Sequence, residues 1–256
     1  MSAPEKTAII VPAFNEPGIE TTLDGLYRQH QRDDYTHHFV VDNGSTDNTR
    51  EYIERFARNH DDFPLSVVEE SQKGTGAASD TGFRTAIDSG YAIIARTDAD
   101  TVPMPDWTAH VSDNFSRNET LQLLGGKSLP LHDDYYRPGD YLLLPMAVRM
   151  ARIALTLKHL DRDYLSAVVG HNMATRAEAY QSTGGFERSS IDEMDEDIDY
   201  SLKVAAHYGR SSIRIDPELA VQTSMRRMRK YGLAGTAIHH LFPDLRKNRR
   251  DAIDIR

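Results

Sequence analysis

The chain has 256 residues, enough for one large domain or two small ones around a sizeable core. It has no cysteine, which excludes disulfides, thiolate nucleophiles and cysteine-ligated zinc or iron–sulfur sites. The net charge is −9, yet residues 225–256 carry nine lysines and arginines against three aspartates, so this end is basic. No apolar run is long enough to span a bilayer, and residues 1–6 lack the apolar core of a signal peptide, so we expect a soluble, cytoplasmic protein.

Strand and helix patterns alternate over the first hundred residues. Apolar, β-rich runs at 7–11, 38–41, 65–68 and 91–95 predict four strands. Amphipathic spacing at 18–29 predicts the first helix, Asp47 is placed to cap the second, and a third passes through Phe83 and Ile87. This alternation predicts an α/β fold with a mostly parallel sheet and right-handed crossovers.

The second half has less regular patterns. Residues 168–175 read as a strand and 197–206 as a helix. Residues 141–160 form an apolar stretch that carries Arg149, Arg152 and Lys158. A core helix, a dimer contact and an interfacial helix facing a lipid-linked acceptor are all open for this stretch, and we favour core or dimer packing.

Polar segments follow each of the four predicted strands, at 12–16, 42–47, 73–76 and 98–100. Because the carboxyl ends of parallel strands meet at one edge of a sheet, we expect these segments to share that edge. Asp98 and Asp100 suit a hard divalent ion that bridges nucleotide phosphates, although each segment alone also fits a turn or a helix cap. A Gly-x-Gly-x-x-Gly run after the first strand and a Gly-Lys-Ser/Thr loop are both absent, which disfavours dinucleotide dehydrogenases and P-loop enzymes.

Taken in order, the motifs resemble family 2 glycosyltransferases with the GT-A fold. They are Val-Pro-Ala-Phe-Asn-Glu at 11–16, Val-Asp-Asn-Gly-Ser-Thr-Asp at 41–47, Asp-Ala-Asp at 98–100, Gly-His-Asn at 170–172, Gly-Gly-Phe at 184–186 and Glu-Asp at 196–197. The resemblance covers roughly residues 7–225. It implies one domain over 1–225, with a Rossmann-like donor half to about residue 130 and an acceptor half after it. Residues 226–256 would then be a lid or a helical tail.

The resemblance also implies roles for individual residues. Asp100 and Asp98 would hold Mn2+ or Mg2+ against the donor diphosphate. Asp197 would be the base that takes the acceptor proton, with Glu196 and Asp195 as competing candidates. The expected donor-binding residues are Pro12, Ala13, Asn15, Glu16, Asp42, Lys73, Asp98, Ala99, Gly170, His171, Asn172 and Arg227. A purely structural role for His171 is equally consistent with the sequence.

The residues themselves fit such chemistry. Asp42 and Glu16 can accept hydrogen bonds from a base and ribose, and Lys73 can offer a cation. In the acidic run 192–197, mutual repulsion would raise a carboxyl pKa, whereas the start of a helix would lower it, so the net shift is open. The expected activity is metal-dependent transfer of one sugar, with inversion by direct displacement. A retaining enzyme is the alternative.

Two departures from the family pattern matter. Many relatives place a histidine, a potential third metal ligand, after a late strand, and here Val-Gln-Thr-Ser occupies 221–224. The Gln-x-x-Arg-Trp motif of processive synthases is also absent, which favours single-sugar transfer.

We expect a UDP-sugar donor, with GDP- or dTDP-sugars as alternatives, and a hydroxyl acceptor of undetermined class. We expect no nucleic-acid partner, and both peripheral contact with the inner membrane face and a homodimer are open. A sugar-1-phosphate nucleotidyltransferase should carry a basic Gly-rich loop where this chain has Phe-Asn-Glu at 14–16. A non-catalytic nucleotide-sugar-binding module is disfavoured by the intact Asp98, Asp100 and Asp197.

Overall fold

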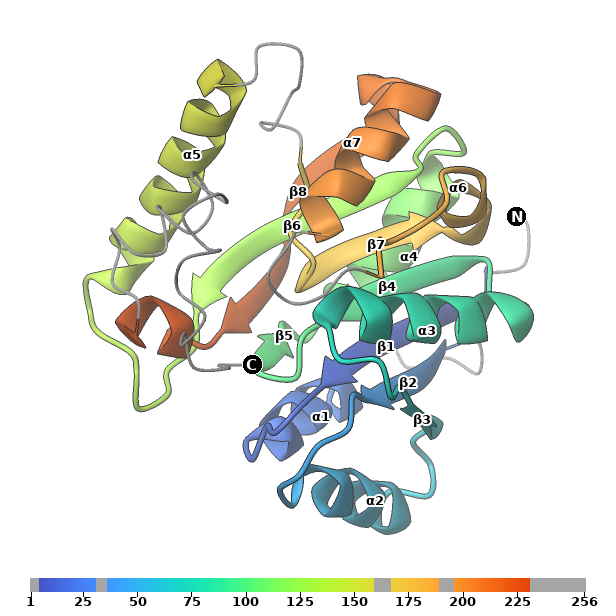
Figure 1. The fold of residues 1–256 in the computed structure, drawn as a ribbon, viewed down its shortest axis with the longest axis vertical. Coiled ribbons are helices and arrows are strands. Elements are labelled where there is room, and N and C mark those ends of the chain that lie inside the picture. The colour runs from blue at the N-terminus through green and yellow to red at the C-terminus, as the bar shows by residue number, and fades with distance from the viewer. Residues whose placement is uncertain (1–4, 31–35, 159–166, 189–195, 231–256) are drawn as a thin grey trace.

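The computed structural model describes residues 5–30, 36–158, 167–188 and 196–230 (Figure 1). The strands in these ranges are β1 (Thr7–Ala13), β2 (Thr36–Asp42), β3 (Leu65–Glu69), β4 (Ile93–Thr97), β5 (Thr101–Pro103), β6 (Leu123–Pro130), β7 (Asn172–Arg176) and β8 (Ile213–Thr223). The helices are α1 (Ile19–Tyr27), α2 (Thr49–Asn59), α3 (Thr75–Asp88), α4 (Trp107–Arg117), α5 (Asp140–Lys158), α6 (Ala177–Ser182) and α7 (Glu196–Tyr208), with a 3-10 turn at Arg210–Ser212.

The strands form one mixed sheet in the order β3-β2-β1-β4-β7-β6-β8-β5. Strands β1 to β4 are parallel to one another, as predicted, and β6 is parallel to β8. Strand β7 runs antiparallel to both β4 and β6, and β5 runs antiparallel to β8. The predicted α/β fold is therefore confirmed, and the carboxyl ends of β1 to β4 define one edge, which we call the rim.

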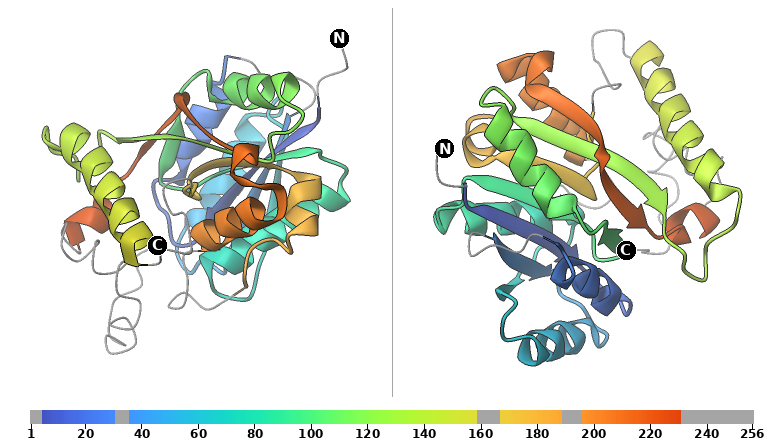
Figure 2. Two further views of the ribbon diagram at one scale, coloured as in Figure 1. Left: turned by 90° about the horizontal axis from the view of Figure 1, so that it is seen from above. Right: turned by 180° about the vertical axis from the view of Figure 1, so that it is seen from behind.

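Helices cover both faces of the sheet, as the two views of Figure 2 show. Side chains alternate along β1, so that Ile9 and Val11 pack in one core while Ala8 and Ile10 pack in the other. The first core includes apolar residues of α1, α2 and α4, and the second includes those of α3, α6 and α7. This three-layer arrangement fixes the positions of the loops at the rim.

The local signals for the helices were largely correct. The predicted cap of α2 is off by one residue, because Asn48 is the N-cap and Asp47 precedes it, although the Asp47 carboxylate still accepts the backbone N–H of Thr49 at 2.9 Å. The strand predicted at 168–175 is wrong at its start, because β7 begins only at Asn172. Helix α5 stands beside the body of the protein rather than inside it, and no described helix is long and apolar enough to cross a membrane (Figures 1 and 2).

Candidate functional site

The loops after β1 and β2 are joined by side-chain hydrogen bonds. Asn15 has a positive φ of 47°, a conformation that asparagine tolerates better than most residues. Its carboxamide oxygen accepts the backbone N–H of Thr46 at 2.8 Å, and Ser45 accepts the Asn15 N–H at 3.1 Å. The Asp42 carboxylate accepts the N–H of Ser45 at 3.0 Å. These bonds hold Asn15 and Asp42 side by side at the rim, as the sequence predicted.

The two aspartates after β4 have different electrostatic surroundings. Burial acts to raise the pKa of Asp98, but the Arg96 guanidinium, with His171 and Arg227 nearby, holds that pKa below its ordinary value. Burial raises the pKa of Asp100 to about 6, and the carboxylates of Asp98 and Glu16 act in the same direction. Arg226 and Arg227 oppose this rise without cancelling it, so a further cation beside Asp100 would favour its charged form.

Arg96 joins the end of β4 to the start of α7. Its side chain is 3% exposed, and its guanidinium lies 3.1 Å from an oxygen of Asp98 and 3.1 Å from an oxygen of Glu196. Burial acts to lower the pKa of Arg96, but Asp98, Glu196 and Asp197 together raise it, so the guanidinium stays charged. A Cβ at Gly170 would lie 2.8 Å from this guanidinium, which explains why a glycine stands there.

The acidic pair at the start of α7 is bound in two ways. Asp197 accepts the backbone N–H of Gly170 at 2.6 Å with one oxygen and that of Ile198 at 2.8 Å with the other. Burial raises the pKa of Glu196, with Asp197 adding to the rise and Arg96 opposing it. The backbone thus orients Asp197, while Arg96 holds Glu196. The third candidate base, Asp195, lies outside the described residues.

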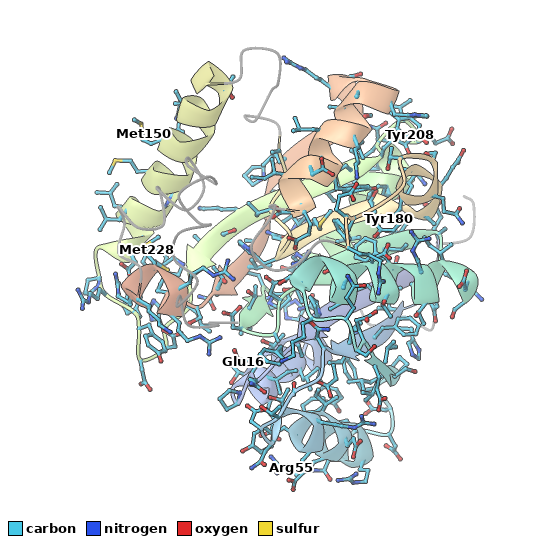
Figure 3. The ribbon with its side chains drawn as sticks, in the orientation of Figure 1. Glu16, Arg55, Met150, Tyr180, Tyr208 and Met228 are labelled. Atoms are coloured by element: carbon cyan, nitrogen blue, oxygen red, sulfur yellow. The ribbon has the colours of Figure 1, made fainter. Side chains whose placement is uncertain are left out.

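A basic segment after β8 reaches the same rim. Arg226 forms an ion pair with Glu16, and its guanidinium lies 3.6 Å from Asp100. Glu16, labelled in Figure 3, lies in the loop between β1 and α1. The Ser224 N–H donates to the Asp100 carbonyl at 3.1 Å, so strand pairing itself brings the basic segment to the Asp pair. Arg227 is exposed.

The other residues that were predicted to bind the nucleotide-sugar differ in how exposed their side chains are. Lys73 is exposed, with its ammonium 5.5 Å from the centre of the Phe14 ring, and His171 bonds Ser128 at 2.6 Å. The side chains of Pro12, Ala13 and Ala99 are buried, so these residues can offer a ligand little more than their backbone.

The prediction that the Asn172 side chain contacts the sugar is wrong. Asn172 is fully buried: it accepts from the Trp107 indole at 2.8 Å and donates to the carbonyls of Lys127 and Leu219, each at 3.0 Å. It therefore ties β7 to β6, β8 and α4. Asn172 was predicted to lie inside a strand at 168–175, whereas β7 begins at this residue, and the pattern could not show on which side of the strand the carboxamide lies.

The carboxylates at the rim fit a hard divalent cation. Mg2+ and Mn2+ are held by one or two carboxylates together with water and phosphate oxygens, and Asp98 and Asp100 provide such a pair. Within the described ranges, no cluster of three or more histidine, aspartate or glutamate side chains is arranged to hold a metal alone. The donor set therefore suits an ion that is shared with a bound diphosphate.

One site residue and one pairing were missed by the sequence analysis. Arg96 is a charged residue within an apolar strand, and it lies two positions before Asp98 and therefore on the same face; that signal could have found it. The pairing of Arg226 with Glu16 joins residues 210 positions apart, and no local pattern predicts it.

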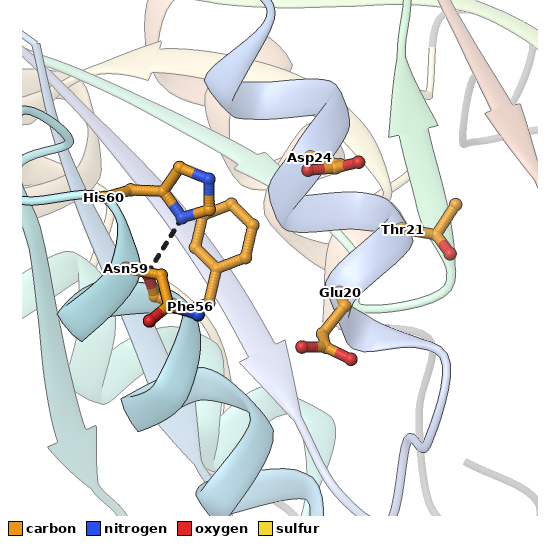
Figure 4. A pocket seen from close by; sticks show the side chains of 6 residues that line it. All are labelled: Glu20, Thr21, Asp24, Phe56, Asn59 and His60. Atoms are coloured by element: carbon orange, nitrogen blue, oxygen red, sulfur yellow. Dashed lines mark hydrogen bonds between the residues drawn. The ribbon is translucent and has the colours of Figure 1, made fainter.

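A hollow of about 350 Å³ lies elsewhere, between α1 and α2 (Figure 4). It is lined by Glu20, Thr21, Asp24, Phe56, Asn59 and His60. None of these residues belongs to the rim site, and the His60 ring is held by the Phe56 carbonyl at 3.0 Å.

Comparison with known sequences gives a family match over most of the chain. The model described as "Glycosyl transferase family 2" matches residues 8–184. Glycosyltransferase AglE of Haloferax volcanii is 33% identical over 120 residues, which is 46% of this chain and 38% of AglE. The polyprenol monophosphomannose synthase of Mycolicibacterium smegmatis is 28% identical over 126 residues, or 49% of this chain and 46% of that protein. The matches thus span less than half the length of these two relatives.

Solved structures give the same fold. Mannosyltransferase PcManGT from Pyrobaculum calidifontis, in complex with GDP-Man and Mn2+, aligns with a TM-score of 0.64 and 21% identity over 99% of this chain and 79% of that one. Glucosyl-3-phosphoglycerate synthase from Mycobacterium tuberculosis, in complex with Mn2+, UDP and glucosyl-3-phosphoglycerate, aligns with a TM-score of 0.64 and 18% identity over 97% and 82%.

Proposed function

Because the chain belongs to glycosyl transferase family 2, we propose that it transfers one sugar from a nucleotide-diphospho-sugar to an acceptor hydroxyl, with inversion and with Asp197 as the base. One observation carries this proposal. The guanidinium of Arg96 contacts both Asp98, beside the candidate metal site, and Glu196, next to Asp197. Carboxylates joined by one guanidinium would therefore serve both the leaving diphosphate and the attacking hydroxyl.

The donor half of the site would hold the nucleotide. Asp42 and Glu16 lie at the ends of neighbouring strands, where they can accept hydrogen bonds from base and ribose hydroxyls. Asp98 and Asp100 would hold Mn2+ or Mg2+, which neutralises charge on the leaving diphosphate. Arg226 and Arg227 lie beside these carboxylates and can meet the diphosphate oxygens, which are better partners for arginine than water.

The acceptor half of the site would remove the proton of the acceptor hydroxyl. As the acceptor oxygen attacks carbon one, its proton passes to Asp197, the bond from carbon one to the diphosphate breaks, and the electron pair leaves with the diphosphate. Each oxygen of Asp197 accepts one backbone N–H, which fixes the orientation of the carboxylate that would take the proton. Glu196 is held by Arg96, which makes it the weaker candidate. Attack from the side opposite the diphosphate inverts the anomeric centre.

Donor turnover tests this proposal. The purified chain is incubated with UDP-, GDP- and dTDP-sugars and Mn2+, and release of nucleoside diphosphate is measured. We expect Asp197→Asn to lower kcat by about 100- to 10,000-fold with little change in donor Kd, because it removes a proton acceptor and not a donor contact. Asp199→Asn, two residues later in α7 and paired with Lys203, is the matched control and should retain turnover. Equal turnover by Asp197→Asn and the native chain would refute the role of Asp197.

A further inference from the structure

Exposed apolar side chains gather on one part of the molecule. Of the seven large hydrophobic residues that are exposed in the described ranges, five lie between residues 135 and 150. Leu142, Met146 and Met150 are 73%, 53% and 61% exposed. Their spacing of four residues places them in one stripe along α5. Figure 3 shows Met150 pointing away from the sheet, so this stripe faces outward from the protein.

The helix that carries the stripe is basic, although the chain as a whole is acidic. Residues 141–158 contain Arg149, Arg152 and Lys158 and no acidic residue. The one acid of α5, Asp140, is buried in an ion pair with Arg229. The chain, of net charge −9, thus carries its apolar stripe on a helix whose charged residues after Asp140 are all basic, and Arg149 among them is exposed.

The segment after β8 extends this basic surface. The Arg229 ion pair with Asp140 and its hydrogen bond to the Tyr135 carbonyl at 2.9 Å fix that segment against the start of α5. Arg227 and Lys230 on it are exposed. The segment lies next to the lower end of α5 in both Figures 1 and 2.

We propose that α5 is a membrane-contact helix that lies flat on an anionic lipid surface, with Leu142, Met146 and Met150 in the interface and the exposed Arg149, Arg227 and Lys230 at the headgroups. An apolar stripe flanked by basic residues is the pattern of helices that bind such surfaces. At about 1.5 Å per residue its 19 residues extend about 28 Å along the surface, and α5 lacks the apolarity to cross the membrane. A second copy fits less well, because a two-fold contact would bring two basic helices together.

The test is co-flotation of the full chain with vesicles of phosphatidylcholine alone or mixed with phosphatidylglycerol. We expect at least about tenfold more protein on the anionic vesicles, since basic residues near a negative surface each add to binding. The triple variant Leu142→Asp, Met146→Asp, Met150→Asp should lose this binding by at least about tenfold. Ile215→Asp, at a 41% exposed position on β8, is the matched control and should bind like the native chain.

Several outcomes would overturn the proposal. Native protein that stays off anionic vesicles, or a triple variant that binds them as well as the native chain, contradicts it. Light scattering that shows a native dimer and a monomeric triple variant would assign the stripe to a second copy instead. Melting temperature and nucleotide binding, measured on the same variants without vesicles, show that the fold and rim site are intact. Failure of the membrane contact is thereby distinct from failure of the proposed sugar transfer.

Discussion

Replacing Arg96 by methionine should destabilise the fold and separate the two halves of the site. The variant removes the counter-charge of Asp98 and Glu196, whose side chains are 33% and 14% exposed. Removing one partner of a buried pair costs about 3–5 kcal/mol, and partial exposure of Asp98 places the expected loss in the free energy of unfolding near about 3 kcal/mol. In a chain of this length each kcal/mol lowers Tm by about 2–4 °C, so we expect a drop of about 6–12 °C.

The assay is thermal unfolding of a small set of variants. Arg96→Lys keeps the positive charge but lacks the planar guanidinium whose nitrogens reach both carboxylates. Its Tm should therefore lie between those of the native chain and Arg96→Met. Arg117→Met removes an arginine that is 79% exposed and paired with Asp113, and it should change stability by less than about 1 kcal/mol.

A second substitution tests whether unpaired carboxylates cause the loss of stability in Arg96→Met. Glu196→Gln in the Arg96→Met background should recover part of the lost stability, because it removes the carboxylate left without its partner. The reasoning is refuted if Arg96→Met melts like the native chain, or if adding Glu196→Gln lowers Tm further.

Four further predictions concern charge at the rim. The pKa of Asp98 is lowered from 3.8, so its stabilisation is present above that pH and lost as pH falls through the folded-state value; Asp98→Asn should lower Tm at neutral pH and matter less in acid. The pKa of Glu196 is raised, so its ionisation opposes folding as pH rises through the folded-state value, and Glu196→Gln should make Tm less dependent on pH in that range; opposite trends for the two variants would contradict both assignments. Because the pKa of Asp100 is about 6, stabilisation by Mn2+ with nucleotide should shrink as pH falls through that value, and a pH-independent gain in Tm would count against Asp100 as ligand. Arg227→Ala should weaken nucleoside-diphosphate binding by about threefold to tenfold in calorimetry, whereas an unchanged Kd, like that expected for Arg117→Ala, would remove Arg227 from the site.

The sequence predicted the donor side of the fold well because its signals are local. Buried parallel strands read as continuous apolar runs, and β1 to β4 each end in a polar segment that the parallel arrangement brings to one rim. The other part of the sheet, from β7 onward, depends on contacts between residues that are far apart in the chain. Strand β7 pairs antiparallel with β4 and β6, and nothing in residues 172–176 specifies those partners.

Within the site, residue type was easier to predict than orientation. Asp98, Asp100 and Asp197 stand at the ends of elements, where chain position alone indicates exposure to a ligand. Asn172 was expected to bind the donor from within a strand predicted at 168–175, yet its carboxamide is hydrogen-bonded inside the protein. The apolar stretch at 141–160 shows a similar limit, because amphipathic spacing marks a face but not what covers it.

The central claim is that the rim binds a nucleoside diphosphate through a cation held by Asp98 and Asp100. The most direct measurement is the shift in Tm with UDP, GDP, dTDP or CDP, each with and without Mn2+, on the native chain and on Asp100→Ala, with Asp106→Ala as an exposed control. A ligand that binds the folded state raises Tm according to its affinity and concentration. The account predicts a Mn2+-dependent rise with one nucleotide that Asp106→Ala keeps and Asp100→Ala loses. Native protein whose Tm is unmoved by all four nucleotides would contradict it.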